Sequence, residues 1–140
     1  MYNLYDSWGY TLSKIAEQMD CMFSERLSAY QIDARDYGIL SIVFNQPKLT
    51  QKEIGEKIVV DRTTMVQLID SLEKKQLITR ESNPSDRRQN LITITKKGQE
   101  IVKKMWVELE HVEREVISTL PAVQKEILAQ IHIYNKEDDR

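Results

Sequence analysis

Two short helices joined by a tight turn, expected over residues 50–75, constrain the fold of this chain more than any other feature. Thr50 and Glu53 form a capping box, in which a hydroxyl and a carboxylate satisfy free backbone N–H groups at the start of a helix. Asp61 is placed to cap a second helix that is expected to reach Lys75. One side of each helix is apolar, with Ile54 and Ile58 in the first and Met65, Val66, Ile69 and Leu72 in the second. This pattern is typical of a helix-turn-helix.

Strand propensity replaces the helical spacing after the second helix. Residues 78–81 and 91–95 are rich in β-branched side chains, which favour strands. The residues between these two segments are polar and include Arg87 and Arg88. We therefore expect a β-hairpin with a long, basic tip over residues 82–90.

Further helices are expected before the helix-turn-helix. An apolar stripe with helical spacing runs from Leu4 to Phe23. Asp33 is expected to cap the next helix. Pro47 ends that helix, because proline disfavours helical geometry in the residue before it.

Two more helices are expected after the hairpin. An apolar stripe runs from Ile101 to Val116, and Leu120-Pro121 then interrupts the helix. The expected fold is mainly α with a small β-hairpin. The first and last helices carry more apolar surface than a small module needs to cover itself, which predicts packing against a second copy as a homodimer. The apolar residues of the last helix are Val123, Ile127, Leu128 and Ile131.

Length and composition narrow the class of protein. A chain of 140 residues suits one domain. No run of about 18 apolar residues is long enough to cross a bilayer, and residues 1–10 lack the pattern of a secretory signal. The single cysteine, Cys21, has no partner for an internal disulfide, which agrees with a reducing compartment. We expect a cytoplasmic protein without a membrane partner.

Charge is distributed unevenly along the chain. Residues 48–98 contain 11 basic and 7 acidic residues, whereas the remainder contains 9 basic and 15 acidic residues. A basic middle between acidic ends fits one DNA-facing module on a scaffold that faces elsewhere. An uneven solvated surface would give the same distribution.

The second helix of the helix-turn-helix contains the residue types that read DNA. Such a helix enters the major groove with the residues near its N-terminus, which here are Arg62, Thr63, Thr64 and Gln67. Arginine pairs with guanine, glutamine pairs with adenine, and threonine contacts a phosphate or a thymine methyl group. The alternative is that these side chains only solvate an exposed helix face.

The hairpin provides a second candidate contact. Arg87 and Arg88 are placed to enter a neighbouring minor groove. Asp86 is expected to orient the Arg88 guanidinium through a bidentate salt bridge. The alternative is a surface ion pair of little energetic weight.

Three segments of the chain resemble the MarR family of winged helix-turn-helix transcription regulators. Residues 72–77 match the end of the family's recognition helix, Asp86-Arg87-Arg88 matches its Asp-x-Arg wing motif, and residues 94–98 match the opening of its fifth helix. Two positions depart from the family pattern. Gln76 stands where glycine is usual, so the turn forms in a left-handed conformation or in a different way. Gln67 stands where arginine is frequent, which leaves the preferred bases open.

The resemblance implies a regulator that binds double-stranded DNA. It implies a repressor that holds a pseudo-palindromic operator as a homodimer, with residues 62–67 in the major groove and Arg88 in the minor groove. The dimerisation helices would then comprise residues 1–30 and 99–140, and the DNA-binding lobe would comprise residues 31–98.

Many MarR-like proteins release DNA when a small aromatic compound enters a cleft between the dimer helices and the DNA-binding lobe. The resemblance therefore makes such a compound the expected effector. The candidate wall residues are Trp8, Tyr37 and Trp106. The alternative is that these aromatic side chains belong to the core, as aromatic residues at helical spacing most often do.

Two other regulators and an enzyme are weighed against this interpretation. A cysteine-based redox sensor would use Cys21, but residues 19–23 contain no basic side chain to favour a thiolate, so we expect a buried, inert thiol. A winged helix used only for protein contacts would have no reason to carry a basic wing tip.

His111 and His132 lack metal-ligand spacing, so we expect no metal. Since no phosphate loop or nucleophile motif is present, we expect neither a cofactor nor enzymatic activity.

Overall fold

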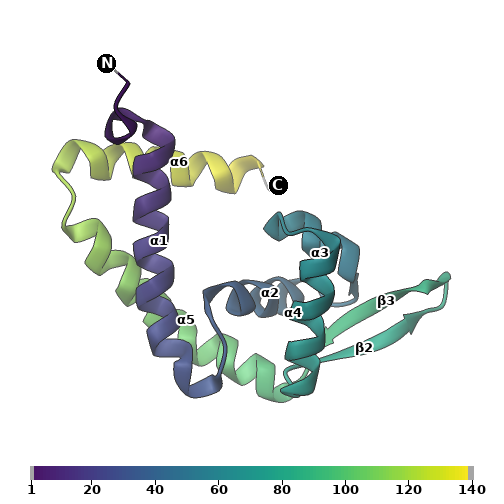
Figure 1. Cartoon of the computed structure of the whole chain (residues 1–140). Helices are drawn as coiled ribbons and strands as arrows, with labels where there is room; N and C mark the ends of the chain where they lie inside the picture. Colours follow the sequence, from purple (N-terminus) through teal and green to yellow (C-terminus); the bar gives the residue numbers. More distant parts are fainter. Residues whose placement is uncertain (1, 139–140) are drawn as a thin grey trace.

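The computed structural model describes residues 2–138 and consists of a lobe of short elements joined to long helices (Figure 1). Helices α1 and α5 pack together, and the hairpin of β2 and β3 projects away from the lobe. The helices are α1 (Trp8–Leu27), α2 (Ala34–Asn45), α3 (Gln51–Ile58), α4 (Arg62–Lys74), α5 (Lys96–Ser118) and α6 (Ala122–Asp138), with short 3-10 turns at Leu4–Asp6 and Ser28–Tyr30. The strands are β1 (Leu49–Thr50), β2 (Ile78–Asn83) and β3 (Asp86–Ile94).

Side-chain caps begin the three helices of the lobe, as the sequence predicts. Asp33 accepts from the backbone N–H of Asp36 at 2.9 Å, and Asp36 accepts in return from that of Asp33 at 3.1 Å. Thr50 and Glu53 form the expected capping box at the start of α3. Asp61 caps α4. Because these contacts lie within a few residues, local sequence is sufficient to predict them.

The sheet differs from the predicted hairpin in two ways. It has three antiparallel strands in the order β1-β3-β2, and the short strand β1 was not predicted. The long loop expected over residues 82–90 is wrong, because β2 extends to Asn83 and β3 begins at Asp86. Backbone pairing between the two strands therefore continues through polar residues whose own strand propensity is low.

One hydrophobic core joins the lobe to the long helices. The rings of Phe23 in α1 and Tyr37 in α2 meet edge to face with centroids 4.9 Å apart. The Tyr37 hydroxyl donates to the Val102 carbonyl of α5 at 2.7 Å, so this buried phenol has its hydrogen bond. The fully buried residues of the lobe include Ile39, Leu40, Val43, Ile54, Ile69, Leu72 and Ile92.

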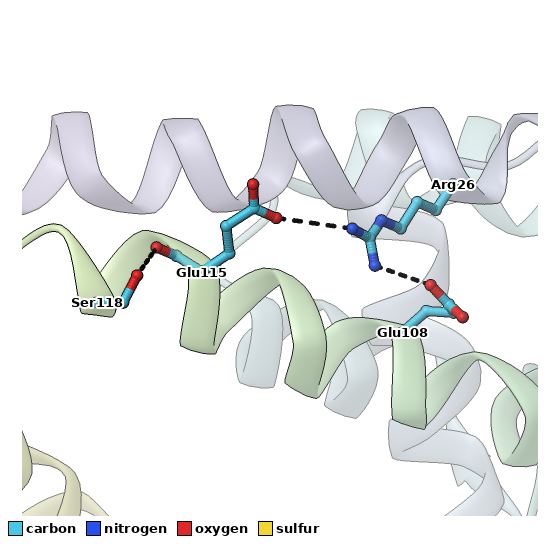
Figure 2. A network of polar contacts seen from close by, with 4 residues as sticks. All are labelled: Arg26, Glu108, Glu115 and Ser118. Atoms are coloured by element: carbon cyan, nitrogen blue, oxygen red, sulfur yellow. Dashed lines mark hydrogen bonds and ion pairs between the residues drawn. The ribbon is translucent and has the colours of Figure 1, made fainter.

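Arg26 makes a polar connection between α1 and α5 (Figure 2). Its guanidinium bonds the Glu108 carboxylate at 2.8 Å and lies 3.7 Å from the Glu115 carboxylate. Ser118 donates to the Glu115 carbonyl one turn further along α5. Because these groups are partly exposed, we assign them a role in fixing the register of the two helices rather than in overall stability.

The two ends of the chain are covered less well than the lobe. The stripe expected as one helix from Leu4 is interrupted, because Leu4–Asp6 forms a 3-10 turn and Ser7 caps α1. The apolar side chains of α6 point largely to solvent in the single chain. Exposed examples are Val123, Ile127, Ile131 and Ile133 on α6, together with Leu4, Tyr5 and Trp8 near the start of the chain.

Candidate nucleic-acid interface

Helices α3 and α4 cross closely at Gly55. A Cβ atom at this position would lie 2.8 Å from Met65 Cγ, so any larger residue would require the Met65 side chain to shift. Val59 ends α3 with φ of 55°, a left-handed conformation that is strained for a β-branched residue. Its side chain is exposed at the tip of the turn. The turn is therefore tight, as the helix-turn-helix pattern requires.

The expected reading residues lie at the N-terminal end of α4. Arg62, Thr63 and Gln67 are exposed. Thr64 is half-buried, and its hydroxyl donates to the Asp61 carboxylate at 2.6 Å. This donation, together with the Thr64 N–H, lowers the pKa of Asp61 below its usual value. Three of the four predicted residues thus face solvent, while Thr64 also takes part in the helix cap.

The wing residues lie on β3, rather than in a loop. Asp86, Arg87 and Arg88 are all exposed. One Asp86 carboxylate oxygen accepts from the backbone N–H of Arg88 at 3.0 Å. The ion pairs recorded among residues 2–138 do not include one between Asp86 and the Arg88 guanidinium, so the expected bidentate contact is replaced by a backbone contact. Asp86 therefore holds the backbone from which Arg88 extends.

A hollow of about 770 Å³ lies between the start of α4 and the first half of β3, the half of that strand nearest the wing tip. Arg62 lines it on one side and Arg88 on the other, and Lys52 of α3 adds a third basic side chain. Asp61 and Asp86 also line it, where each holds local backbone. The sequence analysis missed Lys52, because a lone lysine on a polar helix face carries no signal without the strand that packs opposite it.

A left-handed residue connects α4 to the wing. Gln76 has φ of 62°, so this residue adopts the conformation that glycine would favour. The Thr95 hydroxyl donates to the Gln76 carbonyl at 2.8 Å. A Cβ atom on Gly98 would overlap the Leu77 carbonyl, so glycine is required where α5 passes this turn. The turn after α4 is thus fixed from both sides.

The three candidate effector residues occupy different environments. Tyr37 is buried in the core with its hydroxyl bonded, as described above. Trp106 is exposed on α5, and its indole N–H donates to Glu110 at 3.0 Å. Trp8 lines an apolar crevice of about 270 Å³ between α1 and α6. The single chain does not gather these side chains around one cavity.

Cys21 is exposed in the single chain, so the expectation of a buried thiol is wrong. The absence of a basic neighbour, on which the expectation was based, bears on thiolate formation and not on burial. His111 and His132 are exposed on α5 and α6. Within the described residues, no group of three or more His, Cys, Asp and Glu side chains is arranged to hold a metal ion. No helix in this part of the chain has the length and apolar composition to cross a membrane.

The tight helix pair, the left-handed turn after it and the three-stranded sheet define a winged helix-turn-helix protein. The MarR family model matches residues 32–89. The HTH-type transcriptional regulator SarZ of Staphylococcus aureus is 30% identical over 100 residues, which cover 66% of this chain and 68% of that protein. The chain belongs to the MarR family of transcription regulators.

Other comparisons agree with the fold. A putative transcriptional regulatory protein for the hcr operon of Thauera aromatica is 37% identical over 62 residues, which span 44% of this chain and only 37% of that protein. A crystal structure of MarR superposes with a TM-score of 0.85 at 19% identity, covering 99% of this chain and 95% of that one. CouR of Rhodococcus jostii RHA1, solved with p-coumaroyl-CoA bound, gives a TM-score of 0.78 at 22% identity, covering 97% and 94% of the two chains.

Proposed function

We propose that the protein is a homodimeric repressor that binds a pseudo-palindromic DNA operator. The observation that carries this proposal is the hollow between α4 and the wing, which has Arg62 on one side and Arg88 on the other. A duplex that seats its phosphate backbone in this hollow would place one groove at α4 and the neighbouring groove at β3.

In this arrangement the two elements read different features of DNA. Arg62, Thr63 and Gln67 meet base edges in the major groove, where arginine and glutamine distinguish guanine and adenine. The Thr64 hydroxyl donates its proton either to the Asp61 carboxylate of the cap or to a phosphate of the duplex. Arg88, with Arg87 beside it, enters the minor groove and responds to groove width and negative potential.

The uncovered ends of the chain supply the dimer interface in this proposal. Apolar residues of α1 and α6 line the crevice of about 270 Å³, among them Leu12 and Ile127. A second copy related by two-fold symmetry would cover this surface. The two lobes, residues 31–98 of each copy, would then contact half-sites about 34–36 Å apart. The dimerisation segments are residues 1–30 and 99–140.

A small aromatic effector is the third part of the proposal. CouR, a structural neighbour, was solved with p-coumaroyl-CoA, and PcaV of Streptomyces coelicolor was solved with its natural ligand. Trp8 and Trp106 of this chain are exposed and are available as wall residues once a second copy is present, whereas Tyr37 already serves the core. An effector that binds only the DNA-free arrangement would release the operator.

The decisive experiment begins with selection of bound duplexes from a random library, which yields the site and its half-site spacing together. Binding is then measured across a salt series, since contacts to phosphates weaken steeply as salt rises. Arg88→Ala is expected to weaken all sites by a similar factor and to lower the salt slope by about 1. Lys104→Ala removes the same charge from an exposed position on α5 that does not line the hollow, and it is the matched control.

Gln67→Ala tests the other contact. Its loss is expected to cost about 1–3 kcal/mol at one preferred base pair and to leave nonspecific affinity almost unchanged. If Gln67→Ala weakened binding to every site equally and Arg88→Ala changed the base preference, the assignment of Gln67 to base reading and of Arg88 to the minor groove would be reversed. Failure to recover any duplex would instead favour a winged helix that binds proteins only.

A further inference from the structure

Arg80 of β2 bonds two carboxylates of the recognition helix. Its guanidinium forms ion pairs with Asp70 and, at 3.4 Å, with Glu73. Both partners lie on α4, in the turns that follow Gln67. Figure 1 shows β2 running beside the C-terminal end of α4 before the hairpin projects outward. This side chain therefore connects the helix to the root of the wing.

The surroundings of Arg80 keep its side chain in place. Only 23% of the side chain is exposed, and Nε is buried with no partner among the described atoms. Arg80 pairs with Ile92 across the sheet, and Ile92 is fully buried and also pairs with Leu49 of β1. Arg80 thus extends from an edge strand whose cross-strand partner, Ile92, lies on the central strand β3, which is paired on both sides.

We propose that Arg80 is a positioning residue that fixes the angle between α4 and the wing, so that the major-groove and minor-groove contacts form together. This inference rests on the proposed function, because it needs both contacts to be made with DNA. Arg80 itself contacts no DNA. Its charge is outweighed by the two carboxylates, so it adds no net attraction to a phosphate.

The physical basis is effective concentration. Once one contact with DNA has formed, it raises the effective concentration of the residue that makes the other contact. When α4 has docked, a wing held at the correct angle presents Arg88 to the minor groove without further loss of conformational freedom. A wing that pivots about its root must first be ordered, so the same contact contributes less. The planar guanidinium bridges two carboxylates at once, whereas a lysine ammonium is a point charge on a flexible stem.

A double-mutant cycle tests this role. Affinity for the selected operator is measured for the parent, Arg80→Lys, Arg88→Ala and the double variant. We expect Arg80→Lys to weaken operator binding several-fold. We also expect the loss of affinity caused by Arg88→Ala to be smaller, by a factor of about three or more, in the Arg80→Lys background than in the parent. A merely structural role for Arg80 would lower stability without changing the penalty for Arg88→Ala. Lys104→Ala, combined with Arg88→Ala, is the control pair and should be additive.

Two results would overturn the proposal. One is additivity of Arg80→Lys and Arg88→Ala. The other is a salt slope lowered by about 1 in Arg80→Met, which would indicate a direct phosphate contact. If Arg80→Lys fails to fold, Asp70→Asn combined with Glu73→Gln breaks the same ion pairs from the helix side and enters the same cycle. A parent protein that binds no duplex would contradict the proposed function, whereas a binding parent with an additive cycle contradicts only the role of Arg80.

Discussion

The lobe and the ends of the chain differ in how completely they are covered. In the lobe, Ile69 of α4 is 0% exposed and packs in a core with residues of α2, α3 and the sheet. On α6, Val123 is 67% exposed, and Trp8 near the start of α1 is 66% exposed. Both regions are rich in apolar residues, so composition alone does not distinguish them. The difference indicates that the lobe is complete within one chain and that the ends are complete only when something covers them.

The largest effect is expected at the uncovered end. Leu128→Asp places a charge in the apolar crevice between α1 and α6, and an unpaired buried charge is strongly unfavourable. We expect the dimer dissociation constant to rise about 100-fold or more, measured by sedimentation equilibrium. Gln130→Asp, on an exposed position of the same helix, is the control. A parent protein that sediments as a stable, folded species of 16.5 kDa at micromolar concentration would contradict the idea that a second copy covers the ends of the chain.

The second prediction compares two positions on α4. Ile69→Ala removes three methyl or methylene groups from a filled core, and we expect it to lower the free energy of unfolding by about 2–5 kcal/mol. Val66→Ala, on the exposed side of the same helix, should change it by less than about 1 kcal/mol. Urea denaturation at constant protein concentration measures both. Equal effects would mean that the core of the lobe is not closed within one chain.

A smaller effect is expected at the cap of α3. Thr50→Ala removes the hydroxyl that accepts from the Glu53 N–H, and caps of this kind contribute about 0.5–2 kcal/mol. Thr50→Ser keeps the hydroxyl and should retain most of that stability. Thermal unfolding of the two variants provides the measurement. A serine variant as unstable as the alanine variant would assign the loss to the packing of Thr50 against β3 instead.

The smallest effect is expected at Cys21. This thiol is exposed on α1 of the single chain. Cys21→Ser should leave the free energy of unfolding within about 0.5 kcal/mol of the parent, and mild peroxide should leave operator binding by both proteins unchanged. Release of DNA by oxidised parent, but not by the serine variant, would establish the redox-sensing alternative.

Local chemistry decided which features could be predicted from the sequence. The caps at Asp33, Thr50 and Asp61 are confirmed, because their partners lie within a few residues. On the predicted apolar face of α4, Met65, Ile69 and Leu72 are buried, whereas Val66 is exposed. The strand β1 could not be predicted, since two residues carry no periodicity and their pairing partners, Leu91 and Ile92, lie about 40 residues away. The length of the wing strands was wrong for a different reason, because the polar residues near the turn have low strand propensity of their own.

The candidate site was predicted in part. The exposure of Arg62 and Gln67 follows from helical periodicity, whereas Arg88 was expected in a hairpin loop and is exposed on β3. The backbone contact of Asp86 did not follow, because it depends on where β3 begins. The ion pairs of Arg80 with α4 did not follow either, because they require the packing of the sheet against the helix. Sequence spacing therefore did not predict the contacts between elements.

The bridge between Arg26 and Glu108 has a consequence for how the chain is made. Its two residues are 82 positions apart, whereas the elements of the lobe lie between them. At a ribosomal rate of 5–20 residues per second, α1 waits about 4–16 s after its own synthesis before the matching turn of α5 exists. During that time the lobe can already fold around its own core. The face of α1 that later packs on α5 therefore remains uncovered while the lobe is being synthesised.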